Sequence, residues 1–165
     1  MPEGDSNQMK RLLVFAVFCS SLSTVAYSFE YAGFRSGMSV AEAAVAGAQS
    51  GHPIFPIKNK PDYFWIGQPP DANGTILFCG DKLASLSLNI AGGLDAYAST
   101  TQSFLAQYGQ PAAQAQSGYT ESGLLSNLQL RWQLDSGEDV TLSLTSFQSG
   151  APYSAVSYGA TKSYC

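Results

Sequence analysis

The chain has 165 residues, 12 of them acidic and 8 basic, which gives a formal net charge of −4 at pH 7. Binding to nucleic acid or to an anionic membrane surface needs a basic stripe that neutralises phosphates, so this sparse and acidic charge pattern argues against both classes of partner. Hydrophobic residues make up 45% of the chain, which is enough to fill one domain with a real core.

The N-terminal segment has the pattern of a Sec-type signal peptide. Lys10 and Arg11 precede the apolar run 12–18, and Ala26 and Ser28 supply the small residues that signal peptidase requires. The apolar run is shorter than the roughly 20 residues that a permanent membrane helix needs. We therefore expect export and cleavage after Ser28.

Export divides the chain into residues 1–28, an N-terminal extension with a cleaved signal peptide, and residues 29–165, a single exported domain. We expect this domain in the periplasm or secreted, with no stable membrane insertion. Met9 directly precedes the basic pair, so translation starts either there or at Met1. Cys19 lacks the small preceding residue that lipidation requires, which favours its removal with the signal.

The exported part contains two cysteines, Cys79 and Cys165. An even count in an oxidising compartment predicts a disulfide bond between them. In the chain-entropy model, closing a loop of this length contributes about 4–5 kcal/mol to stability. The alternative is a nucleophilic Cys79, which needs a nearby base. The single histidine, His52, lies in a Gly-His-Pro turn, and nothing in the sequence brings it to Cys79.

The first predicted element of the exported domain is a helix over residues 40–49. Ser39 can cap its N-terminus, and Glu42, three residues on, completes a capping box. Residues 54–61 contain prolines and are predicted to be an irregular loop. Strands are predicted at residues 62–67, 75–79 and 83–90, the last with an alternating pattern.

A second helix is predicted over residues 97–108. Phe104 and Tyr108 stand at helical spacing on it, and Gly109 ends it. Three further strands are predicted at residues 128–134, 140–145 and 153–158. This order of elements predicts an α+β fold in which two helices pack on an antiparallel sheet.

The elements also suggest an internal repeat of a helix-strand-strand-strand unit, with half-repeats at residues 29–92 and 93–165. At an offset near 67 residues Trp65 matches Trp132, and each precedes a glycine-containing turn. We interpret the two tryptophans as two halves of a core. The alternative is a chance similarity, because small α+β proteins draw on a narrow set of units.

Two short segments resemble a known group of proteins. Residues 34–42, Phe-Arg-Ser-Gly-Met-Ser-Val-Ala-Glu, resemble the Gly-Met-Ser/Thr-x-x-Glu helix start of the SmpA/OmlA outer-membrane assembly lipoproteins and the β-lactamase inhibitory proteins. Residues 105–111 are similar to the helix exit of these families, an apolar residue followed by Gly-x-Pro. In the inhibitors, helical segments and antiparallel strands form a duplicated unit. The resemblance implies such a fold for this chain, and no particular function.

Residue patterns that support catalysis or cofactor binding are scarce in the sequence. It contains no Gly-x-Ser-x-Gly elbow, no P-loop and no spacing typical of metal ligands, so we expect no catalytic residues, no metal and no cofactor. Glu138 and Asp139 are adjacent carboxylates beside a turn. We expect them to be a solvated pair whose side chains point to opposite faces of a strand.

Aromatic residues on the predicted strands are the remaining candidates for function. We expect Tyr63, Tyr153 and Tyr158 to be exposed on the sheet and to contact a partner, because such residues anchor protein interfaces. The sequence thus predicts a non-catalytic protein of the bacterial cell envelope that binds another envelope or secreted protein through a sheet face and loops. An envelope hydrolase and a glycan-binding module are the alternatives, and the oligomeric state is left open.

Overall fold

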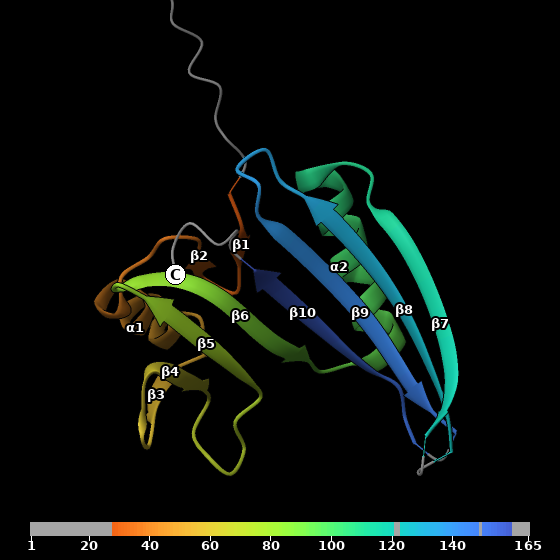
Figure 1. The fold of residues 1–165 in the computed structure, drawn as a ribbon, viewed down its shortest axis with the longest axis horizontal. Helices are drawn as coiled ribbons and strands as arrows, with labels where there is room; N and C mark the ends of the chain where they lie inside the picture. Colours follow the sequence, from red (N-terminus) through yellow and green to blue (C-terminus); the bar gives the residue numbers. More distant parts are fainter. Residues whose placement is uncertain (1–27, 121–122, 149, 160–165) are drawn as a thin grey trace, which may run out of the picture.

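The computed structural model describes residues 28–120, 123–148 and 150–159. Within these ranges the chain forms two helices, an eight-stranded antiparallel sheet and a separate two-stranded ribbon (Figure 1). The predicted α+β class, with two helices and an antiparallel sheet, is confirmed.

The helices are α1 (Val40–Gln49) and α2 (Gly93–Tyr108). The ribbon consists of β1 (Glu30–Tyr31) and β2 (Phe34–Arg35). The strands of the large sheet are β3 (Ile54–Ile57), β4 (Lys60–Ile66), β5 (Gly74–Cys79), β6 (Lys82–Ile90), β7 (Ala112–Thr120), β8 (Gly123–Gln133), β9 (Asp139–Phe147) and β10 (Tyr153–Gly159). Neither helix in the described ranges is long and apolar enough to cross a membrane.

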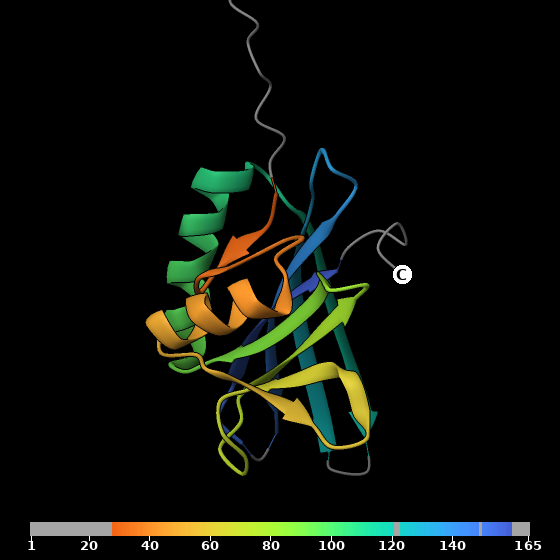
Figure 2. The same ribbon diagram turned by 90° about the vertical axis from the view of Figure 1, so that its left-hand side faces the viewer.

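The strands of the sheet follow the order β3-β4-β5-β6-β10-β9-β8-β7. Each helix is therefore followed by four sheet strands, where three were predicted, and the two sets meet where β6 pairs with β10. Both helices lie on the same side of the sheet (Figure 2). We call the side toward the helices the covered face and the other side the open face.

Helix α1 has the predicted bounds because its N-terminus is capped as the sequence indicates. The backbone N–H of Ser39 donates to Oε2 of Glu42 (2.8 Å), and the backbone N–H of Glu42 donates to Oγ of Ser39 (3.3 Å). The Ser39 hydroxyl also donates to Oε2 of Glu42 (2.9 Å). The bonds that the Glu42 carboxylate accepts, first from the Ser39 backbone and then from its hydroxyl, lower the pKa of Glu42 below its usual range. The capping box thus fixes where the chain enters the first helix.

Two strands of the sheet lie where no strand was predicted. Strand β3 falls in the proposed irregular loop, and it accommodates Pro56 because it is an edge strand. Strand β7 contains three Ala and one Gly among its nine residues, which are residue types of low strand propensity, and its antiparallel pairing with β8 determines its conformation. Helix α2 also begins earlier than predicted, at Gly93. The residue before it, Gly92, has a φ of 110°.

The two tryptophans lie on opposite faces of the sheet. Trp132 is 2% exposed, meets Phe104 of α2 edge-on at 5.4 Å between ring centroids, and donates from Nε1 to the carbonyl oxygen of Gly109 (2.9 Å). Trp65 is 36% exposed and lies on the open face. The interpretation of the pair as matching halves of a core is therefore wrong. Successive residues of a strand point to opposite faces, so an offset between two half-repeats that is wrong by one residue matches a side chain on one face with a side chain on the other.

The segment that precedes α1 completes the core on the covered face. Phe29 and Phe34 are fully buried, and the Phe29 ring stacks on that of Tyr158, with 4.4 Å between centroids and 12° between planes. Tyr31 meets Phe104 edge-on at 5.6 Å. The first residue of the proposed mature chain is thus already part of the core.

We expect Phe29→Ala to destabilise the domain by about 3–5 kcal/mol, because the substitution removes a buried ring and leaves a cavity against Tyr158. Urea denaturation of the exported domain measures the change. Val45→Ala is the matched control, since Val45 is mostly exposed on α1 and its truncation should change stability by less than about 0.5 kcal/mol. Equal stability of the Phe29→Ala variant and the unsubstituted protein would contradict this packing.

Candidate binding face

The open face is defined by the register of the sheet. One row of directly opposed residues crosses all eight strands in the order Phe55, Trp65, Thr75, Ser87, Ser157, Thr141, Arg131 and Ala112. Directly opposed residues point to the same face. Trp65 and Arg131 are exposed, and neither helix of the described residues lies on this side, so the row belongs to one face that carries no described helix (Figure 1).

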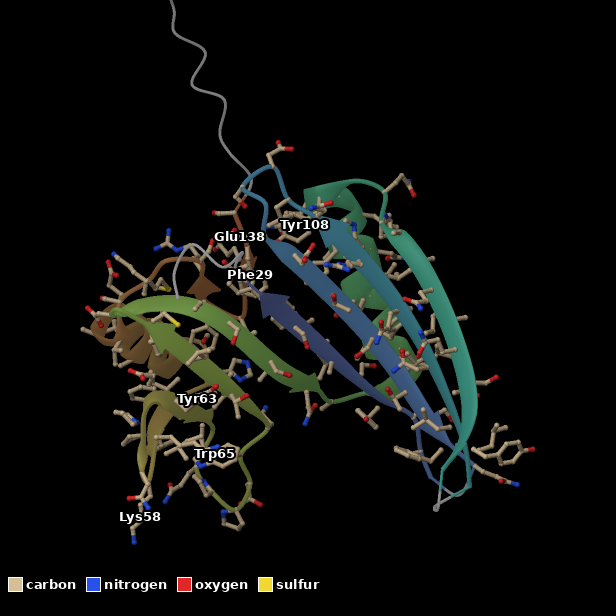
Figure 3. All side chains as sticks on the ribbon, viewed as in Figure 1. Phe29, Lys58, Tyr63, Trp65, Tyr108 and Glu138 are labelled. Atoms are coloured by element: carbon tan, nitrogen blue, oxygen red, sulfur yellow. The ribbon has the colours of Figure 1, made fainter. Side chains whose placement is uncertain are left out.

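One end of the open face is aromatic and apolar. Tyr63 and Trp65, two residues apart on β4, are both exposed and project from the same side of the strand (Figure 3). Leu77 lies directly opposite Tyr63 on β5. The Lys60 ammonium lies 5.4 Å from the centroid of the Tyr63 ring, a cation–π contact worth about 0.5–1 kcal/mol at an exposed site. Tyr63 is thus exposed on the sheet, as the sequence predicted.

The other end of the open face has a hollow of about 620 Å³. Residues that line it include Gln114, Gln129, Arg131, Asp139, Thr141 and Ser157. Asp139 accepts a hydrogen bond from Arg131 through Oδ2, and this bond, together with the charge of Asp139, raises the pKa of Arg131. Oδ1 of Asp139 is buried and has no hydrogen-bond partner among the described residues. This oxygen is therefore a buried acceptor beside the hollow that no described group satisfies.

Tyr153 is exposed as expected, at the start of β10. It lies directly opposite Thr145, and its ring stacks against that of Phe147 with 6.2 Å between centroids. Thr141 and Thr145 are four residues apart on β9, so Tyr153 belongs to the same face as the row defined above. It marks a second aromatic site, on the half of the sheet opposite to that of Tyr63.

Tyr158, in contrast, is not available to a partner. Its side chain lies on the covered face, is almost fully buried under Phe29, and donates a hydrogen bond from its hydroxyl to Oε1 of Glu138 (2.5 Å). The expectation of an exposed Tyr158 was wrong. Successive residues of a strand point to opposite faces. Ser157 lies on the open face, so its neighbour Tyr158 lies on the covered face.

The expected solvated pair, Glu138 and Asp139, is only half correct. The two side chains do point to opposite faces, but Glu138 is buried and accepts hydrogen bonds from Tyr158 and from Oγ of Ser136 (2.9 Å). These two donors compensate for the removal of the carboxylate from water. The sequence offers only a weak signal for the burial of Glu138, a carboxylate between a turn and an alternating strand, and the sequence-based prediction missed this burial.

The residues considered for catalysis are not gathered into a site. His52 lies between α1 and β3 and donates its backbone N–H to the carbonyl oxygen of Gly47 (2.7 Å). Cys79 ends β5, whereas Cys165 lies outside the described residues, so their disulfide bond stays a prediction. In residues 28–120, 123–148 and 150–159, no three His, Cys, Asp or Glu side chains are grouped so that they could hold a metal ion.

Comparison of the chain with models of protein families, with curated proteins and with solved structures gives no match.

Proposed function

We propose that this chain is an exported, non-catalytic protein of the bacterial cell envelope that binds another envelope or secreted protein through the open face of its sheet and the adjoining loops. The observation that carries the proposal is the open face itself. It bears Tyr63 and Trp65 in exposed positions, and both helices of the described part of the chain lie on the other side of the sheet (Figure 1 and Figure 2).

The chemistry of this face suits a protein partner. Large aromatic side chains supply most of the binding energy where they are desolvated, and polar groups around them fix the orientation of the partner. Here Tyr63 and Trp65 are the aromatic side chains, and Arg131 and Asp139 in the hollow are the polar groups.

We also propose that the domain arose by duplication of a unit of one helix and four strands. The strand order supports this, since it reads the same outward from the β6–β10 pair in both directions. Thr75 and Thr141 occupy matching places on either side of Ser87 and Ser157 in the row across the sheet. A duplicated unit is also what the resemblance to the β-lactamase inhibitory proteins implies, and we extend that kinship to the fold alone.

A glycan-binding module is the second candidate. Sugar rings stack on exposed Tyr and Trp, and the amide side chains of Gln114 and Gln129 in the hollow suit hydroxyl groups. Competition distinguishes the two candidates, because soluble envelope polysaccharide releases the protein from a glycan and leaves a protein complex intact. The hydrolase alternative requires that His52→Ala abolish an activity of the purified domain.

Export and disulfide formation are tested together by the intact mass of protein isolated from the periplasm or medium. We expect residues 29–165 alone, lighter by two hydrogens because Cys79 and Cys165 are joined. A mass that includes residues 12–28 would contradict cleavage after Ser28. Labelling of both cysteines by a thiol reagent in the native protein would contradict the disulfide bond.

Trp65→Ala and Tyr63→Ala should each weaken partner binding about thirtyfold, since loss of an aromatic anchor at an interface costs about 2 kcal/mol or more. Immobilised mature domain first captures a partner from envelope extract, and calorimetry with the purified partner then gives Kd for each variant. Val45→Ala removes an exposed apolar side chain from α1 and should leave Kd unchanged. The proposal is wrong if both aromatic variants bind as tightly as the unsubstituted domain.

A further inference from the structure

The two edges of the sheet differ in how well they are protected against pairing with another strand. Strand β3 forms one edge; it has four residues, contains Pro56 and shifts register after it. Strand β7 forms the other edge; it has nine residues, with the sequence Ala-Ala-Gln-Ala-Gln-Ser-Gly-Tyr-Thr, and contains neither a charge nor a proline. Short length, proline and charge are three of the features by which edge strands avoid pairing. Strand β7 has none of them.

The hydrogen-bonding pattern shows which backbone groups of β7 face the free edge. The N–H of Leu124 donates to Oε1 of Gln148 (3.4 Å), and its carbonyl accepts from the N–H of Gln148 (2.9 Å), so both groups point away from β7. Tyr119 lies directly opposite Leu124, and its own N–H and C=O therefore point outward. Since this orientation alternates along a strand, the backbone groups of Ser117 and Ala115 also point to the free edge.

Beside this edge the covered face carries an exposed ring and an apolar groove. Tyr119 is 87% exposed. A groove of about 410 Å³ is lined by Ala115, Ser117, Leu128 and Leu144, among others, and Leu128 is exposed in it. Tyr119 and Ala115 are an even number of residues apart, so ring and groove lie on the same face of the same strand.

We propose that β7 pairs antiparallel with β7 of a second copy of this chain, with Ser117 opposite Ser117 of the second copy. In this register Tyr119 of each copy lies opposite Ala115 of the other, where its ring covers the groove beside Leu128. Ala115, Ser117 and Tyr119 are also the residues whose backbone groups face outward, so they form the hydrogen-bonded pairs of the new ladder.

A second copy fits this edge better than an unrelated strand because the contact is self-complementary. The projecting Tyr119 and the receiving Ala115 stand at equal distances from Ser117, so one two-fold axis satisfies both. The strand carries no charge, and the net charge of −4 therefore produces no direct repulsion at the contact. The axis is perpendicular to the sheet, and both open faces consequently lie on the same side of the dimer.

The size of the contact sets the expected affinity. One strand edge and two tyrosine rings bury less than the roughly 1,200 Å² of a stable complex. We therefore expect a dimer that dissociates on dilution, with Kd in the micromolar range. Sedimentation equilibrium of the mature domain over a range of concentrations should show the transition. A single-chain mass up to about 1 mM would overturn the proposal.

Charge substitution at Ser117 tests the register. Ser117→Lys and Ser117→Glu each place like charges opposite one another, so each variant alone should dimerise at least tenfold more weakly. Mixed in equal amounts, the two should form a heterodimer as tight as the unsubstituted dimer or tighter, which also shows that both variants are folded. Ser99→Lys, on the exposed surface of α2, is the matched control and should dimerise normally.

Amide hydrogen exchange gives an independent reading. At concentrations that favour the dimer, the outward amides of Ala115, Ser117 and Tyr119 should gain protection, whereas that of Gln116, which already faces β8, should change little. Dimerisation of Ser117→Lys equal to that of the unsubstituted domain would overturn the proposal. So would a mixture of the Lys and Glu variants that does not associate.

Discussion

The pairing of β6 with β10 is the interaction on which the rest of the structure depends. It runs from Ile90 opposite Ser154 to Ser85 opposite Gly159, and the hydroxyl oxygens of Ser87 and Ser157 approach to 3.5 Å near its middle. All other pairs in the sheet join strands adjacent in the chain, so this one alone closes a long loop, the costly step in assembling such a fold. It turns two four-stranded sheets into one, with both helices on one face.

The covered face is completed from the N-terminal side of α1. Phe29 lies over Tyr158 of β10, and the Tyr158 hydroxyl in turn donates a hydrogen bond to the buried carboxylate of Glu138. The Tyr108 hydroxyl at the end of α2 accepts a hydrogen bond from the backbone N–H of Glu30 (3.1 Å), and burial raises its pKa. The N-terminal segment, α2 and β10 therefore form one packed unit on the covered face.

Local signals in the sequence predicted the elements that carry them. Helix α1 follows from the Ser39–Glu42 capping box, and β6 follows from its strict alternation. Strand β7 could not be predicted, because Ala and Gly favour a strand only when a neighbouring strand supplies its hydrogen bonds. The site was predicted in part: Tyr63 and Tyr153 are exposed, whereas Tyr158 is buried. The face of a β-strand residue depends on a register that no local pattern fixes.

The sheet has one covered and one open face, and the two tryptophans of the chain report on one face each. Hydroxyl-radical footprinting with mass spectrometry measures their accessibility in a single sample of the folded domain. This arrangement of the sheet predicts rapid oxidation of Trp65 and protection of Trp132, with both oxidised equally once the domain is unfolded in urea. Equal oxidation of the two in the folded domain, or faster oxidation of Trp132, would contradict it.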